Sequence, residues 1–214
     1  MRRLPLAFYA RRTTTVARAL LGQRLVSTVD GERCVARIVE VEAYLGPYDP
    51  ASHSYRWHRS LRNDTMYGPP GRLYVYFTYG MHWCANVVTE HDGYPAAVLL
   101  RAAEPLEGLD VMRRRRAGRP DAELLAGPAR LAQALGITGD LDGHRLSGAP
   151  VWIADGEPVP PVRREVTVRV GVARGAELRL RWCERGNPHV SKRRAESPAR
   201  RSHRGSTPGT TGAS

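Results

Sequence analysis

The stretch 37–53 constrains the fold more than any other part of this 214-residue chain. Its first half alternates aliphatic side chains with two carboxylates and a tyrosine, as Val39-Glu40-Val41-Glu42-Ala43-Tyr44. Successive side chains of a strand point to opposite faces, so this pattern predicts a strand with one apolar and one acidic face. Gly46-Pro47 ends it. Two interpretations stay open: an edge strand with a solvated acidic face, or carboxylates that belong to a site.

The composition limits the class of protein and its partners. The length predicts one domain, and a hydrophobic fraction of 42% is enough for a core. The net charge of +12 favours a polyanionic partner, with nucleic acid first and an anionic membrane surface second. No apolar run approaches the roughly 20 residues that span a bilayer, and the N-terminus does not read as a secretory signal. We therefore expect a cytoplasmic protein, nucleoid-associated if bacterial, that does not bind membranes.

The order of the predicted elements is mixed. Helices are predicted over 13–21, 106–116 and 127–135, and the proline-rich stretch 46–72 is predicted to be a loop. Besides the strand of the first paragraph, strands are predicted over 73–79, 82–89, 96–102, 151–153, 165–172 and 178–182. Residues 192–214 hold six basic side chains and few apolar ones, so we expect a disordered basic tail.

Aromatic side chains and one acid on the predicted strand, the loop after it and the predicted hairpin could together line a pocket. Glu42 and Tyr44 share a strand face, and His53 follows within one loop. Tyr74 and Tyr76 share a face of the hairpin predicted over 73–89. Together they suit a flat, cationic or electron-poor ligand that stacks on electron-rich rings. The alternative is that the tyrosines are ordinary strand residues.

The predicted hairpin carries a large aromatic beside its turn, in Thr78-Tyr79-Gly80-Met81-His82, with the turn at Gly80-Met81. An exposed apolar wedge of this kind inserts between base steps in some DNA-bending proteins. The other interpretation is a tip that folds back on its own domain. The arginine run 113–116 is similarly open, since it could face phosphates or form a solvated helix end.

Several familiar chemistries have no support in the sequence. Four of the seven histidines, His53, His58, His82 and His91, are candidates for a metal site, but their spacings do not match metal-ligand patterns. No phosphate-cradling glycine motif or nucleophile elbow is present. The three cysteines, Cys34, Cys84 and Cys183, form no disulfide framework and no Cys-x-x-Cys spacing. We therefore expect no metal and no cofactor.

Several segments together closely resemble the alkyladenine (3-methyladenine) DNA glycosylases of the type with a protruding β-hairpin. The segments are 17–22, Val39-Glu-Val-Glu-Ala-Tyr-Leu-Gly-Pro47, Ala51-Ser-His53, Gly71-Arg-Leu-Tyr-Val-Tyr-Phe-Thr-Tyr-Gly-Met81, Cys84-Ala-Asn86, 98–108, Gly127-Pro128, 169–172 and 185–191. The resemblance covers roughly residues 5–191, so we assign 1–191 to a glycosylase domain and 192–214 to the tail. It implies a single α/β domain of mixed α+β type, with a curved, mainly antiparallel sheet, flanking helices and a protruding hairpin.

The resemblance also implies a reaction. A glycosylase of this type flips an alkylated purine out of duplex DNA, because a stacked base is out of reach, and hydrolyses its N-glycosidic bond. Glu42 would be the general base that activates water for attack at the sugar C1′. Arg101 would help to hold that water beside Glu42. Alkylated purines leave readily, so one carboxylate suffices for the chemistry.

The remaining implied roles concern the DNA. Tyr44, His53 and Tyr76 would line the flipped base, and Asn86 would exclude the 2-amino group of undamaged guanine. Tyr79 would fill the gap that the base leaves in the duplex. The loop 53–69 and the connection 173–177 depart from the family pattern, which leaves the lesion range open.

Rival functions remain at this point. The chain could be a non-catalytic damaged-DNA binding protein of the same fold, although Glu42 rather than glutamine favours an enzyme. It could be an RNA-binding module, but it lacks an Arg-Gly-Phe-Gly-Phe-Val pattern. We expect a monomer that acts on double-stranded DNA containing damaged bases. The only lysine is Lys192, so we expect a monofunctional enzyme without an amine nucleophile.

Overall fold

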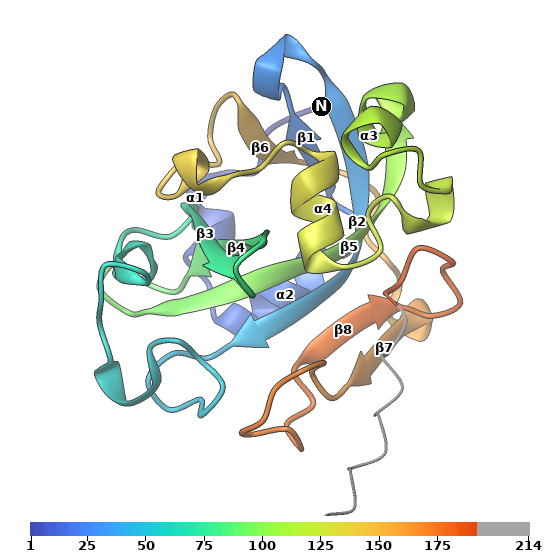
Figure 1. Ribbon diagram of the computed structural model, residues 1–214. Coiled ribbons are helices and arrows are strands. Elements are labelled where there is room, and N and C mark those ends of the chain that lie inside the picture. The colour runs from blue at the N-terminus through green and yellow to red at the C-terminus, as the bar shows by residue number, and fades with distance from the viewer. Residues whose placement is uncertain (192–214) are drawn as a thin grey trace, which may run out of the picture.

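One curved sheet organises the computed structural model, which describes residues 1–191 (Figure 1). Six strands lie in the order β3-β4-β5-β2-β1-β6, and β8 pairs with both β2 and β7. All neighbouring strands are antiparallel. The strands are β1 (Arg24–Ser27), β2 (Cys34–Tyr44), β3 (Leu73–Thr78), β4 (His82–Thr89), β5 (Ala96–Glu107), β6 (Val151–Ala154), β7 (Arg164–Thr167) and β8 (Arg181–Glu184).

Short helices cover the sheet. They are α1 (Leu6–Tyr9), α2 (Thr13–Leu20), α3 (Leu109–Arg115) and α4 (Pro128–Ala134). In Figure 1, α2 lies behind β2 and β5 while α4 lies in front of the sheet, against β4 and β5. Because both faces are covered, β2 and most of β5 are buried along their length. No helix in the described part of the chain is long and apolar enough to cross a membrane.

The structure confirms the predicted fold class, a mixed α+β domain with a curved antiparallel sheet and a β3–β4 hairpin. The expected disordered tail, 192–214, lies outside the described residues. Between Gly46 and Arg72, where a loop was predicted, the chain forms only short 3₁₀ turns at Tyr55–Trp57 and Asp64–Tyr67. Further 3₁₀ turns lie at Val29–Gly31, Asp121–Glu123, Gly139–Leu141 and Pro161–Arg163.

Several boundaries differ from the predicted ones because tertiary pairing overrides local preference. Strand β5 continues to Glu107, where it still pairs with the start of β2, so α3 begins only at Leu109, after Gly108 with φ 79°. Strand β7 is much shorter than the predicted 165–172, because Val170 bonds to a side chain of β2 instead of to a strand. Neither β1 nor α1 was predicted.

The register of β2 against β5 shifts on either side of Glu40. On one side Val39 is an extra residue of β2, and on the other Arg101 is an extra residue of β5. Bulges of this kind bend a strand and re-aim its side chains. Here the two irregularities bring Arg101 within reach of both Glu40 and Glu42.

Candidate functional site

Glu40 and Glu42 lie on a central strand, not at an edge. Strand β2 has β5 along one side, and β1 and β8 along the other. Both carboxylates are fully buried, at 0% exposure. The interpretation as a solvated acidic edge is therefore wrong. A buried carboxylate is costly unless charged or hydrogen-bonding partners surround it, so the partners of each indicate its role.

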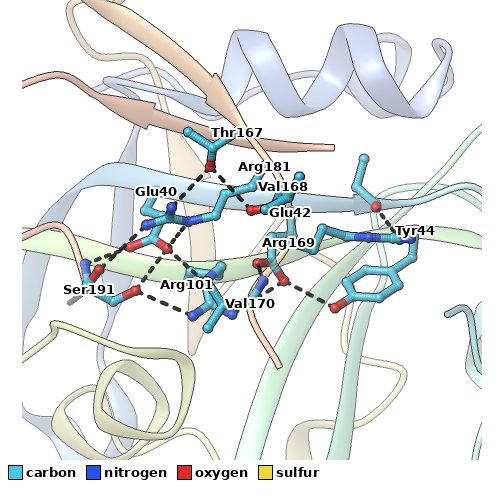
Figure 2. A network of polar contacts seen from close by, with 11 residues as sticks. Glu40, Glu42, Tyr44, Arg101, Thr167, Val168, Arg169, Val170, Arg181 and Ser191 are labelled. Atoms are coloured by element: carbon cyan, nitrogen blue, oxygen red, sulfur yellow. Dashed lines mark hydrogen bonds and ion pairs between the residues drawn. The ribbon is translucent and has the colours of Figure 1, made fainter. Parts of the chain in front are cut away.

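Glu40 is saturated with donors. Its Oε1 accepts from Arg101 Nε at 2.7 Å, from Arg181 Nε at 2.7 Å and from the Ser191 hydroxyl at 2.8 Å, while its Oε2 accepts from the Ser191 amide at 2.7 Å (Figure 2). Burial alone would raise its pKa, but the two guanidiniums outweigh burial, and the pKa of Glu40 is lowered. Glu40 is thus a fixed anion that holds two arginines and the end of the described chain.

Glu42 has fewer donors and a different electrostatic balance. Its Oε1 accepts from the Val170 amide at 2.7 Å, and its Oε2 accepts from the Tyr44 hydroxyl at 3.0 Å and lies 3.2 Å from Arg101 Nη1 (Figure 2). Burial raises the pKa of Glu42, and the opposing effects of Arg101 and these hydrogen bonds do not cancel the rise. A buried carboxylate with a raised pKa beside an arginine is typical of a general base.

A cavity of about 370 Å³ opens beside Tyr44 and unites the predicted binding residues. It is lined by Tyr44, His53, Tyr76, Tyr79 and Asn86, together with parts of 50–53 and 171–174. Its size falls in the range of small-ligand sites. Glu42 and Arg101 are not lining residues. Glu42 bonds directly to the hydroxyl of the lining residue Tyr44, and Arg101 lies beyond it, against the same Glu42 oxygen.

The aromatic wall formed by His53, Tyr74 and Tyr76 is held by specific contacts. Nδ1 of His53 lies 2.8 Å from the Tyr74 hydroxyl, and the rings of His53 and Tyr76 meet edge to face at 4.6 Å. Burial, followed by the nearby Arg62, lowers the pKa of His53 to about 4. The imidazole is therefore neutral near pH 7, so His53 itself adds no positive charge to this electron-rich wall.

Asn86 lies in the wall between β3 and β5. It is buried, pairs with Tyr74 across the hairpin, and donates from Nδ2 to the Tyr74 carbonyl at 3.1 Å. This bond fixes the amide side chain at the cavity surface.

The tip of the β3–β4 hairpin stands away from the domain. Tyr79 is 84% exposed, so the interpretation in which the tip folds back is wrong. The turn is centred on Tyr79-Gly80, one residue earlier than predicted, with φ of 51° and 67°. An aromatic residue with positive φ is uncommon, and here this conformation sets Tyr79 at the cavity mouth.

The arginine run 113–116 has local partners instead of a free basic face. Arg113 pairs with Asp110 and Asp121, Arg114 with Glu32, Arg115 with Asp30 and Glu32, and Arg116 with the Gln133 side chain. These contacts favour the structural interpretation of the run. No group of three or more His, Cys, Asp or Glu side chains within residues 1–191 is arranged to hold a metal ion.

Sequence reasoning missed the residues that support the two carboxylates. Arg181 on β8, Val170 and Ser191 all bond to Glu40 or Glu42, from positions more than 100 residues away. The spacing of the chain gives no signal for such contacts. The family resemblance included Val170 and Ser191, through the segments 169–172 and 185–191, but not Arg181.

Comparisons with known proteins agree with this geometry. Residues 7–188 match the family described as methylpurine-DNA glycosylase. The chain is 47% identical over 191 residues to a protein of Carboxydothermus hydrogenoformans named "Putative 3-methyladenine DNA glycosylase", covering 89% of this chain and 99% of that one. The chain is also similar to two proteins with the same name. One is from Chlorobaculum parvum (45% identical, covering 94% of this chain and 96% of that one), and the other is from Burkholderia lata (50% identical, covering 88% and 90%). The chain belongs to the methylpurine-DNA glycosylase family and is a DNA glycosylase.

Proposed function

We propose that this protein excises alkylated purines of the 3-methyladenine class from double-stranded DNA, with a water that Glu42 activates. The observation that carries the proposal is the link between Glu42 and the cavity. A buried carboxylate with a raised pKa bonds to Tyr44, and Tyr44 in turn lines an aromatic cavity of ligand size. The reaction belongs to base excision repair.

The cavity suits the chemistry of an alkylated purine. Methylation at a ring nitrogen gives a flat base with positive charge, which electron-rich rings attract. Tyr44 and Tyr76 supply such rings, and the low pKa of His53 means that the imidazole adds no competing positive charge. The same positive charge makes the base a good leaving group, so no general acid is needed.

The water would bind between Glu42 and Arg101. A carboxylate oxygen has two acceptor sites, so a water can share Oε1 with the Val170 amide, or replace the Tyr44 hydroxyl at Oε2. Arg101 lies on the Oε2 side and can orient the water while Glu40 holds the guanidinium in place. The carboxylate would stabilise the positive charge of the oxocarbenium-like transition state, and the guanidinium would help to position the nucleophilic water.

The surroundings of the cavity suit a flipped nucleotide. Tyr79, at the cavity mouth, would fill the gap that the base leaves in the duplex. Among the described lining residues, Arg174 is the one with a permanent charge, and it is exposed, as a phosphate contact would require. We propose that the protein acts as a monomer.

The test is a panel of duplex oligonucleotides that each carry one lesion. After incubation, alkali cleaves strands at abasic sites, and gel analysis reports excision. We expect cleavage for alkylated purines, and none with Glu42→Gln, which should still bind a duplex containing an abasic-site analogue. Glu107→Gln is the matched control, because Glu107 is a half-exposed glutamate whose one ion pair within residues 1–191 is with Arg33. Lesion binding without excision by the wild type would support the non-catalytic alternative instead.

A further inference from the structure

Asp49 and Arg169 form a fully buried ion pair next to the cavity. Nη1 of Arg169 donates to Asp49 Oδ2 at 2.5 Å and Nη2 donates to Oδ1 at 2.8 Å, in the bidentate geometry that arginine favours. Both side chains are 0% exposed. Burial alone would raise the pKa of Asp49, but the bonds from Arg169 outweigh burial, so the pKa of Asp49 is lowered.

The pair contacts the residue that joins the cavity to Glu42. The Arg169 guanidinium lies 4.8 Å from the centre of the Tyr44 ring and also donates to the Ala43 carbonyl at 3.0 Å. Arg169 does not line the cavity, whereas Tyr44 does. The guanidinium thus packs against the Tyr44 ring without lining the cavity, and Figure 2 shows the two side chains next to each other.

The same pair fastens two walls of the cavity. Asp49 accepts from the amides of Leu45 and Ala51, which shapes the turn that leads into the lining residues 50–53. Arg169 precedes Val170, whose amide bonds to Glu42, and the lining residues 171–174 follow directly. One ion pair therefore connects both walls, the Tyr44 ring and a hydrogen bond to Glu42.

A buried ion pair adds little net stability compared with apolar residues of the same size. Its bidentate hydrogen bonds, however, fix the orientation of the two side chains and of the segments that carry them. We propose that Asp49 and Arg169 are positioning residues for excision, which hold Tyr44 against the flipped base and keep Glu42 aligned. This inference rests on the proposed function and extends it to two residues that do not touch the substrate.

The chain offers a matched control. Arg37 and Glu184 form another bidentate pair between distant segments, at 2.5 and 3.1 Å, with Glu184 fully buried and Arg37 mostly buried. Neither residue lines the cavity. Arg169→Lys and Arg37→Lys each keep the positive charge but lose the bidentate hydrogen bonds of the guanidinium. We expect both variants to lose a similar amount of folding stability, but only Arg169→Lys to disturb the cavity.

The experiment compares excision, DNA binding and thermal unfolding for these two variants and for Asp49→Asn. For Arg169→Lys and Asp49→Asn we expect the single-turnover excision rate to fall about tenfold or more, since small misplacements in a site can cost up to ~100-fold. Affinity for an abasic-site duplex, which leaves the cavity unfilled, should stay within about twofold, because the DNA surface is unchanged. Arg37→Lys should excise at nearly the wild-type rate.

Two results would overturn the positioning role. One is an equal loss of activity in Arg169→Lys and Arg37→Lys at equal loss of melting temperature. The other is that neither Arg169→Lys nor Asp49→Asn folds, which would show that the pair is needed for folding and not specifically for excision. Failure of the proposed function is distinguishable from both, because the wild type itself would then release no alkylated base.

Discussion

Glu40 and Glu42 lie two residues apart on β2 and share the guanidinium of Arg101, yet their pKa values shift in opposite directions. Glu40 also has Arg181 and two donors of Ser191, whereas Glu42 has only single bonds from Tyr44 and Val170 besides Arg101. Environments that push two carboxylates apart in pKa assign them different roles. Glu40 holds the charge network together, and the contrast supports the proposal that Glu42 is the residue that exchanges a proton.

The raised pKa of Glu42 predicts the acid side of the pH profile. A general base works only when deprotonated, so the excision rate should fall as the pH drops through the pKa of Glu42. Burial raises that pKa, so the midpoint should lie above the ordinary glutamate value of 4.5. The midpoint is measured from the single-turnover rate of 7-methylguanine excision at a series of pH values. The positive charge of this base stays constant on the acid side, so protonation of the leaving group does not contribute to the profile. Circular dichroism at each pH controls for unfolding, and a midpoint at or below 4.5 would contradict the assignment.

The same contrast predicts different stability effects for two glutamine variants. The charged form of Glu40 is favoured in the fold, and Glu40→Gln leaves two buried guanidiniums short of a counterion, so a loss of about 3–5 kcal/mol is expected. The charged form of Glu42 is disfavoured, so Glu42→Gln should cost less than about 1 kcal/mol. Urea unfolding of both variants tests the ordering. A larger loss for Glu42→Gln would show that the two roles are reversed.

Part of this site was predictable from the sequence, and part was not. The period-two pattern of β2 placed Glu40, Glu42 and Tyr44 on one face, because side-chain direction in a strand depends only on local spacing. The bulge that inserts Arg101 depends on the register against β5, and the Asp49–Arg169 pair joins positions 120 residues apart. Neither has a local signal, since burial and long-range contacts decide both.

Tyr79 provides a prediction for the hairpin tip. Tyr79→Ala should slow excision about tenfold, since stacking of one base on an aromatic ring is worth roughly 1–3 kcal/mol. The melting temperature should hardly change, because the side chain is 84% exposed. Tyr79→Phe keeps the ring and is the matched control, with a rate close to that of the wild type. A marked loss of melting temperature in Tyr79→Ala would place the ring in the fold instead.

The last prediction concerns the chemistry that the chain lacks. Glycosylases that also nick the strand attack the sugar with an amine and form a Schiff base, for which lysine is the usual side chain. The sequence has no lysine before Lys192, so no lysine side chain lies within residues 1–191. Arginine does not replace it, because the guanidinium stays protonated and is a poor nucleophile. We therefore expect a monofunctional enzyme that releases a free base and leaves an intact abasic strand.

Borohydride distinguishes the two mechanisms, because it reduces a Schiff base to a stable covalent adduct. Added during turnover on an alkylated duplex, it should trap no protein–DNA complex on a denaturing gel, and strand cleavage should require added alkali. Lys192→Ala is the necessary control, since this residue and the N-terminal amine are the only primary amines of the chain. An adduct that persists in Lys192→Ala would show attack by the N-terminal amine and would overturn the role of Glu42 in activating water.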